Sequence, residues 1–199
     1  MIIDFKINCN TYEEKILNKK DFFTYNCPTC GAKHSFTRHA SYKRNIILLS
    51  EDTLVDKKLK ILRLKCSSCN KTHAILPNDI VPYCIYSYSI MIKILYQHLI
   101  DKESVLSLSN KYSISFQLIY FFISKLHSFF NECMHVLRLL NLFSHISTPT
   151  INDILINITT TPLKEYFQKI FFNKTKWMFL MKKFLNIIPK PIIIGAYDT

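Results

Sequence analysis

Hydrophobic and polar residues alternate imperfectly in the first half of the chain. The segments 35–49 and 56–66 have the mixed apolar and basic character of short, exposed β-strands. In the second segment, Leu59, Ile61 and Arg63 would point to one side of a strand and the residues between them to the other. The pattern predicts small antiparallel β-hairpins within residues 21–82.

The pattern changes to a helical one from Tyr83 onward. Apolar residues recur three or four positions apart, and proline is absent from 83 to 148. The clearest pairs and triplets are Ile90 with Ile94, and Leu118 with Phe122 and Leu126. After Pro149 and Pro162, the segment 163–188 is amphipathic and basic, which predicts one or two further helices.

These patterns predict an α+β protein with four parts. A polar lead-in would cover residues 1–20, a ribbon of small β-hairpins 21–82, a helical region 83–130, and a basic amphipathic helical tail 131–199. The prolines and the Asn-Asp pair of 76–82 would form the link between ribbon and helices.

Residues 102–130 fit a helix-turn-helix. The first helix would run from Lys102 to Lys111, and Ser115 would cap the second after the turn 112–115. Ser109 is the small residue that the helix crossing needs, whereas Ser113 occupies a place where glycine is usual. The buried residues would be Leu108, Tyr112, Ile114, Ile119 and Phe122, and the exposed face would be Ser115, Phe116, Gln117, Tyr120 and Phe121.

This exposed face carries groups that can read DNA. Glutamine can hydrogen-bond adenine, and aromatic rings can contact thymine methyl groups. The alternative is an ordinary helical hairpin whose aromatic residues form a core.

Four cysteines stand in two Cys-x-x-Cys pairs, at 27 and 30 and at 66 and 69. Two intervening residues allow both thiolates of a pair to bind one ion from a tight turn. The turn favours, directly after the second cysteine, a residue that can adopt a left-handed conformation. Gly31, one of only two glycines, and Asn70 occupy these places. Four thiolates close a tetrahedral site, which predicts one structural Zn²⁺.

The alternative for these cysteines is a set of redox-active or unrelated thiols. His34, His39 and His73 lie near the pairs and could replace a cysteine, but with four cysteines present we expect them on the surface or hydrogen-bonded to a ligand. The remaining cysteines have no partner at ligand spacing, so we expect small buried apolar residues at Cys9, Cys84 and Cys133.

The chain has a net charge of +12, part of which follows from heavy use of lysine, isoleucine and asparagine together. Between Cys27 and His73 there are ten Lys or Arg and three acidic residues. Such a ribbon can bind phosphates, with Lys43, Arg44 and Arg63 as the expected DNA contacts, or it can be a solvated hairpin.

No signal peptide is visible, and the longest apolar stretch is interrupted by polar residues. We therefore expect a cytoplasmic protein without a membrane partner. In a reducing compartment, its cysteines are more plausible as metal ligands than as disulfides.

The motifs CPTCG, HASYKR, LRLKCSSCNKTHAILP and PYCIYSYSIM, followed by the helix-turn-helix pattern, resemble a bacterial family of transposon-associated zinc-ribbon proteins of unknown function. They are also similar to the N-terminal DNA-binding region of insertion-sequence transposases. The resemblance covers about residues 25–130. It implies recognition of transposon ends or target DNA, a nucleoid location, and the four paired cysteines as ligands.

The chain itself carries no set of catalytic carboxylates, so we expect it not to be an enzyme. Asp198, at the end of an apolar run, is an isolated acid that could begin such a set in a longer transposase. Duplex DNA, a separate transposase subunit and a second copy of the chain are the candidate partners. An RNA-binding ribbon, a protein adaptor and, last, a metal-dependent nuclease are the alternative functions.

Overall fold

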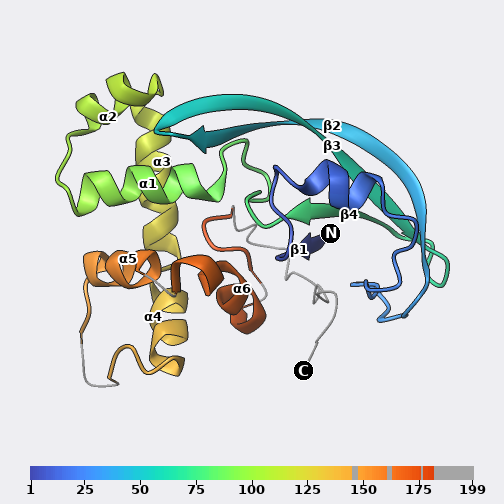
Figure 1. The fold of residues 1–199 in the computed structure, drawn as a ribbon. Coiled ribbons are helices and arrows are strands. Elements are labelled where there is room, and N and C mark those ends of the chain that lie inside the picture. Colours follow the sequence, from blue (N-terminus) through green and yellow to red (C-terminus); the bar gives the residue numbers. More distant parts are fainter. Residues whose placement is uncertain (145–147, 161–162, 176, 182–199) are drawn as a thin grey trace. The chain divides into compact units, whose positions relative to one another are not determined.

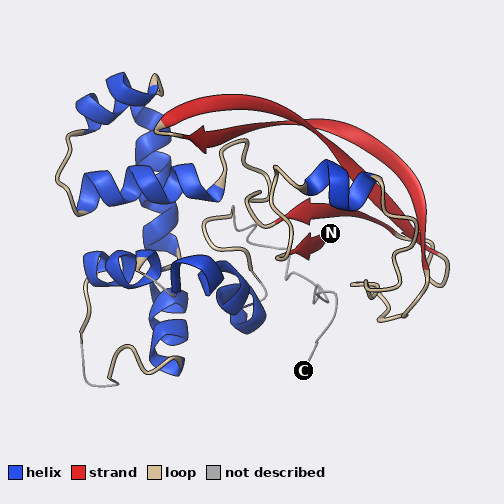
Figure 2. Ribbon diagram, viewed as in Figure 1, coloured by secondary structure: helices blue, strands red, loops and turns tan. Residues whose placement is uncertain are grey.

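A computed structural model describes residues 1–144, 148–160, 163–175 and 177–181. The chain divides into two compact units. The first contains residues 1–47 and 56–80, and the second contains 48–55 and the described residues from 81 on. Within the described residues the fold is mixed α+β, with one four-stranded sheet and seven helices (Figures 1 and 2), which confirms the predicted class.

The four strands lie in the order β1-β4-β3-β2. Their bounds are β1 Ile2–Asp4, β2 Phe36–Ser50, β3 Thr53–Cys66 and β4 Thr72–Pro77. β3 and β4 are antiparallel, with Leu64 opposite His73. β1 runs parallel to β4, with Ile2 opposite Ile75.

Residues 1–20, expected to be a polar lead-in, are instead part of the core of the first unit. Ile2 and Ile3 lie in β1, and Ile16 lies in a π-helix, η1 (Glu13–Leu17); all three are fully buried. The Tyr12 hydroxyl donates to the carbonyl oxygen of Ile75 at 2.8 Å and accepts from a β3 backbone amide at 3.1 Å. The sequence pattern did not indicate that residues 1–20 are part of the core, because their apolar residues do not recur at the spacing of a strand or a helix.

β2 and β3 form one hairpin whose strands have 15 and 14 residues, far longer than the small hairpins expected from the sequence. The two residues of the turn, Glu51 and Asp52, have φ angles of 46° and 68°. Positive φ at both positions is typical of the tight turn that suits the twist of paired strands. The tip of the hairpin, 48–55, belongs to the second unit.

The second unit is helical, as the sequence pattern from Tyr83 predicts. Its helices are α1 (Tyr88–Leu99), α2 (Val105–Tyr112), α3 (Phe116–Ser128), α4 (Phe130–Leu139), α5 (Ile151–Thr159) and α6 (Leu163–Thr175). α1, α2 and α3 pack against one another, and α4 packs against α5 and α6 (Figure 1).

The described part of the predicted tail contributes to the core of this unit. The rings of Phe167, Phe171 and Phe179 are buried and lie within 5.2–5.6 Å of one another, centroid to centroid. Phe129 contacts two of them at 5.7 and 5.8 Å. The helices after residue 130 are therefore not an appended tail, as far as the structure describes them. Residues 182–199, with Asp198, lie outside the described residues.

Candidate metal centre and helical surface

The two Cys-x-x-Cys pairs form turns of the same geometry. The amide of Gly31 donates to the carbonyl of Cys27 at 2.8 Å, and the amide of Asn70 donates to the carbonyl of Cys66 at 2.9 Å. Gly31 and Asn70 have φ angles of 74° and 57°, so both adopt the left-handed conformation that the sequence predicts. In each turn, the amide of the first cysteine also bonds a carbonyl five residues later, at 3.0 and 2.9 Å.

The turns bring four sulfur atoms together. The Sγ atoms lie 3.6 Å apart for Cys27 and Cys69, and 3.8 Å apart for Cys30 and Cys66. All four lie within 4.8 Å of one another. A tetrahedral ion with metal–sulfur bonds of about 2.3 Å requires sulfur–sulfur separations of about 3.8 Å. The cluster therefore has the dimensions of a four-thiolate metal site.

One of the four thiols is favoured as a thiolate. Burial raises the pKa of Cys66, but hydrogen bonds from the Ser35 hydroxyl and from the backbone amides of Cys69 and Ser68 outweigh burial and lower this pKa to about 6. The Ser35 oxygen lies 3.3 Å from the sulfur. Metal ions bind the deprotonated form of cysteine, so these donors favour loading of the site. Ser35 gave no signal in the sequence, because it is distant from Cys66 along the chain.

His73 lies next to the cysteine cluster but is not one of its four members. Its Nε2 lies 3.6 Å from the Cys27 sulfur, and its Nδ1 lies 3.1 Å from the nitrogen of Met1. Burial is the main cause that lowers the His73 pKa to about 4, so the ring is neutral. His73 therefore contacts the sulfur of one clustered cysteine, whereas His34 and His39 are exposed, as expected.

The three cysteines outside the pairs have different surroundings. Cys9 and Cys133 are buried, as expected, and Cys84 is half-buried. The amide of Cys9 donates to a carboxylate oxygen of Asp79 at 2.7 Å. Burial is the main cause that raises the pKa of the Asp79 carboxyl group and also that of the Cys9 thiol. Cys9 is therefore a protonated, unreactive group.

α2 and α3 are joined by a short turn at the predicted place. α2 begins at Val105, not at Lys102, because Lys102 has a φ of 62° and Ser104 caps the helix by accepting from the amide of Ser107. Ser113 has a φ of 51°, the left-handed conformation for which glycine would be usual. Ser115 caps α3 by accepting from the amide of Leu118, as predicted.

The predicted division of this region into core and surface is confirmed. The residues predicted to be apolar core are buried: Leu108, Tyr112, Ile114, Ile119 and Phe122. The residues predicted to be outward are exposed: Ser115, Phe116, Gln117, Tyr120 and Phe121. We call this second set the α3 face. Its three aromatic side chains are 44%, 58% and 39% exposed, respectively.

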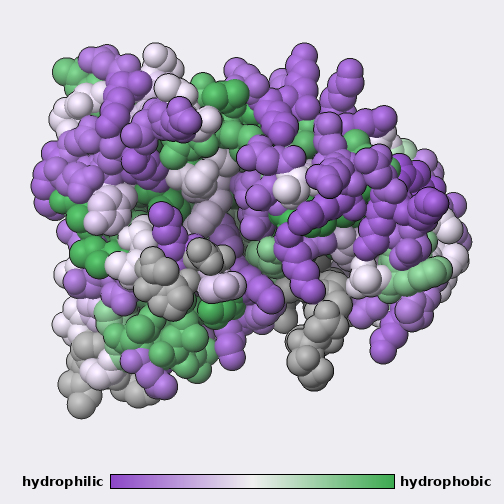
Figure 3. All heavy atoms as spheres, viewed as in Figure 1, coloured by the Kyte–Doolittle hydropathy of each residue, from purple (hydrophilic) through white to green (hydrophobic). Residues whose placement is uncertain are grey.

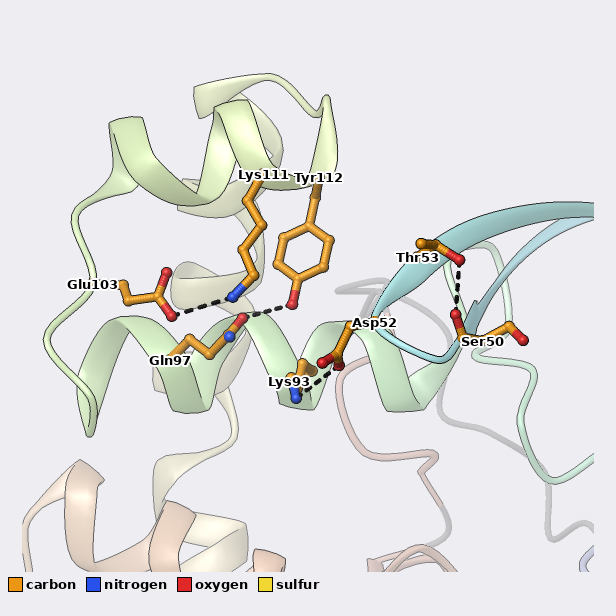
Figure 4. A network of polar contacts seen from close by, with 8 residues as sticks. All are labelled: Ser50, Asp52, Thr53, Lys93, Gln97, Glu103, Lys111 and Tyr112. Carbon is orange, nitrogen blue, oxygen red and sulfur yellow. Dashed lines mark hydrogen bonds and ion pairs between the residues drawn. The ribbon is translucent and has the colours of Figure 1, made fainter.

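One buried hydrogen bond joins α2 to α1 beneath this region, and an ion pair joins α2 to the segment between the two helices (Figure 4). The Tyr112 hydroxyl donates to the buried Gln97 side chain at 2.7 Å. Lys111 and Glu103 form an ion pair at 3.5 Å. The buried hydrogen bond holds α2, and with it the turn that leads into α3, on α1.

The predicted DNA contacts on the ribbon lie on the hairpin strands. Lys43 is exposed on β2, Arg44 is half-buried next to it, and Arg63 is exposed on β3, where it donates to the Thr72 hydroxyl. Hydrophilic side chains gather over β2 and β3 on the face shown in Figure 3. Other cations of the ribbon have structural partners: Arg38 donates to the carbonyls of Leu17 and Lys19, and Lys57 to that of Cys9.

The tip of the hairpin contacts α1 within the second unit. Asp52 and Lys93 form an ion pair at 3.0 Å (Figure 4). Beside it is a pocket of about 500 Å³, lined by Leu49 of the tip and by residues of α1, α5 and α6.

None of the described helices is long and apolar enough to cross a membrane.

One family profile matches the chain, that of DUF6431, a domain of unknown function, over residues 27–111. The match includes all four clustered cysteines, the hairpin, α1 and nearly all of α2, and it stops before α3. No curated protein and no solved structure matches the chain. The part of the chain with a family likeness is therefore similar to a domain whose activity is not described.

Proposed function

We propose that this chain is a zinc-dependent DNA-binding protein of a transposable element, without a catalytic centre of its own. One Zn²⁺ would stabilise the cysteine turns of the first unit. α2 and α3 would act as a helix-turn-helix in the second unit, with the α3 face in the major groove. The transposon association rests on the sequence resemblance.

Zinc is the ion that best suits the cluster. Four cysteine sulfurs at tetrahedral spacing favour Zn²⁺ among the common cellular ions, and a site filled by four protein ligands has no position for a substrate. The role of the ion would therefore be structural. It would join two turns that lie far apart in the sequence, one before β2 and the other between β3 and β4.

The observation that carries the DNA-binding proposal is the division of α3 into a buried and an exposed side. Ile119 and Phe122 are fully buried, whereas Gln117 and Tyr120 project from the first two turns. In a helix-turn-helix, the start of the second helix contacts the base edges. The left-handed turn at Ser113 leaves this start uncovered by α2.

The proposal assigns no catalytic role to the described acidic residues. Asp153 is engaged in a capping box, in which its carboxylate accepts from the amide and the hydroxyl of Thr150 at 2.7 Å. In the part of the chain that the structure describes, the cysteine cluster is the only group of three or more side chains placed to hold a metal ion. Strand-transfer chemistry requires carboxylates that hold two metal ions.

The test is fluorescence anisotropy of the zinc-loaded chain with duplex DNA over a salt series. A steep decrease of the binding constant with salt, and a sequence preference that persists at higher salt, would support the proposal. Single-stranded RNA serves as the competitor. Stronger binding to RNA than to any duplex would favour an RNA-binding ribbon, and no binding at low salt would refute both.

The exposed aromatic residues of α3 also support a second candidate, a protein adaptor. Aromatic side chains are common at protein–protein interfaces, and Phe116 and Tyr120 are about half exposed. An adaptor would bind nucleic acid weakly and form a stable complex with a separate transposase. Sedimentation of the chain alone and with the transposase measures this, and it also shows whether the chain forms a homodimer.

A further inference from the structure

The chemistry of the α3 face limits which base pairs it can read. From Ser115 to Ser124 the sequence has no lysine, arginine, aspartate or glutamate. The first charged residue of α3 is Lys125, more than two turns from the start of the helix, and its ammonium group lies over the ring of Phe121 at 5.2 Å. The exposed groups of the α3 face are thus one amide, two phenyl rings, one phenol and one hydroxyl.

Each base pair requires a different partner in the major groove. Guanine is read mainly by the cations of arginine or lysine, and cytosine donates to carboxylates. Adenine is read by the amide of asparagine or glutamine, and the thymine methyl group is read by apolar contact. The start of α3 has no group of the first two kinds and has both of the others.

These groups are close together on one side of the helix. Phe116 and Tyr120 are four residues apart, as are Gln117 and Phe121, so the members of each pair are neighbours on the helix surface. All four are exposed, whereas Ile119 and Phe122 hold the opposite side in the core. The Gln117 amide is therefore flanked by apolar rings, as an adenine-reading group would be beside thymine methyl groups.

We propose that the α3 face recognises A·T base pairs, with Gln117 bound to adenine and the rings of Phe116 and Phe121 against thymine methyl groups. This inference rests on the proposed function, because it requires α3 to enter the major groove. Phosphate contacts would come from cations elsewhere on the chain, so they would add affinity without sequence preference.

The test begins with selection of bound duplexes from a randomised library by the full zinc-loaded chain. The expected result is a selected core of A·T pairs. Enrichment of a core of G·C pairs would overturn the inference but leave DNA binding intact. If no sequence is enriched and no duplex binds, the proposed function itself fails.

Base analogues in the selected duplex then test each contact. Uracil in place of thymine removes only the methyl group, and burial of one methyl predicts about 4-fold weaker binding for each thymine contacted. 7-Deazaadenine removes the N7 acceptor and should weaken binding about 5-fold or more at the adenine read by Gln117. A duplex that binds equally well with both analogues would refute the assignment.

Variants connect the analogues to the residues. Phe116→Ala should lose the effect of uracil at one thymine position and keep it at the position that Phe121 contacts, and Gln117→Ala should no longer distinguish adenine from 7-deazaadenine. Tyr166→Ala is the matched control, because Tyr166 is an aromatic residue of α6 that is 55% exposed. If the α3 variants keep full DNA preference but change the oligomeric state, the α3 face is a protein interface and the inference is wrong.

Discussion

The substitution Gly31→Ala tests the geometry of the cysteine turns most directly. Gly31 has a φ of 74°, and a Cβ atom added to it would meet no heavy atom within 4 Å other than those of its chain neighbours. The substitution therefore introduces no steric contact with the rest of the protein. Its whole effect comes from the backbone conformation.

The magnitude follows from two opposing terms. A left-handed conformation costs an alanine about 1–2 kcal/mol. The loss of glycine's freedom in the unfolded chain offsets about 0.4–1 kcal/mol of this. The net destabilisation is about 1 kcal/mol. If the turn becomes ordered when the metal binds, the dissociation constant for Zn²⁺ should rise about 5-fold.

The assay is competition for Zn²⁺ between the protein and a chromogenic chelator, for wild type, Gly31→Ala and Gly31→Asn. The asparagine variant is the matched control, because Asn70 occupies the equivalent position of the other turn with a φ of 57°. It should bind zinc more tightly than the alanine variant. Equal affinities for wild type and Gly31→Ala, or a loss far above 10-fold, would refute the reasoning.

Three further predictions concern the cluster, a buried hydrogen bond of the second unit and a buried carboxyl group. Cys66→Ser should abolish stoichiometric zinc content and unfold the first unit, as measured by metal analysis and circular dichroism, whereas Cys84→Ala should keep its zinc; a zinc-loaded Cys66→Ser variant with unchanged melting would remove the metal-site assignment. Tyr112→Phe deletes the donor to the buried Gln97 and should lower the free energy of unfolding by about 1–3 kcal/mol in urea denaturation, while the exposed Tyr120→Phe should have little effect. Burial raises the pKa of the Asp79 carboxyl group above its value in the unfolded chain, so the folded protein binds a proton there more tightly than the unfolded chain does. The free energy of unfolding should therefore rise as the pH falls through the pKa of the folded state toward the pKa of the unfolded state. Asp79→Asn should remove this rise, and an identical pH profile for the variant would contradict the assignment.

The structure confirms the parts of the site that depend on neighbouring residues in the chain. Gly31 and Asn70 adopt the conformation expected after each Cys-x-x-Cys pair. Ser115 caps α3, and the buried and exposed residues around it follow the helical period. Turn conformation, capping and helical period involve interactions within a few residues, so the sequence alone was sufficient for them.

The tertiary structure decided the features that join distant segments. The parallel pairing of Ile2 with Ile75, the hydrogen bond from Ser35 that favours the Cys66 thiolate, and the contact of His73 with Cys27 each connect residues more than 30 positions apart. So does the ion pair of Asp52 with Lys93, which places the hairpin tip on α1. No local pattern marks these residues, because their contacts depend on how the chain closes long loops. The sequence by itself determined which four cysteines form a cluster and which residues of α3 are exposed, and the fold determined which groups surround them.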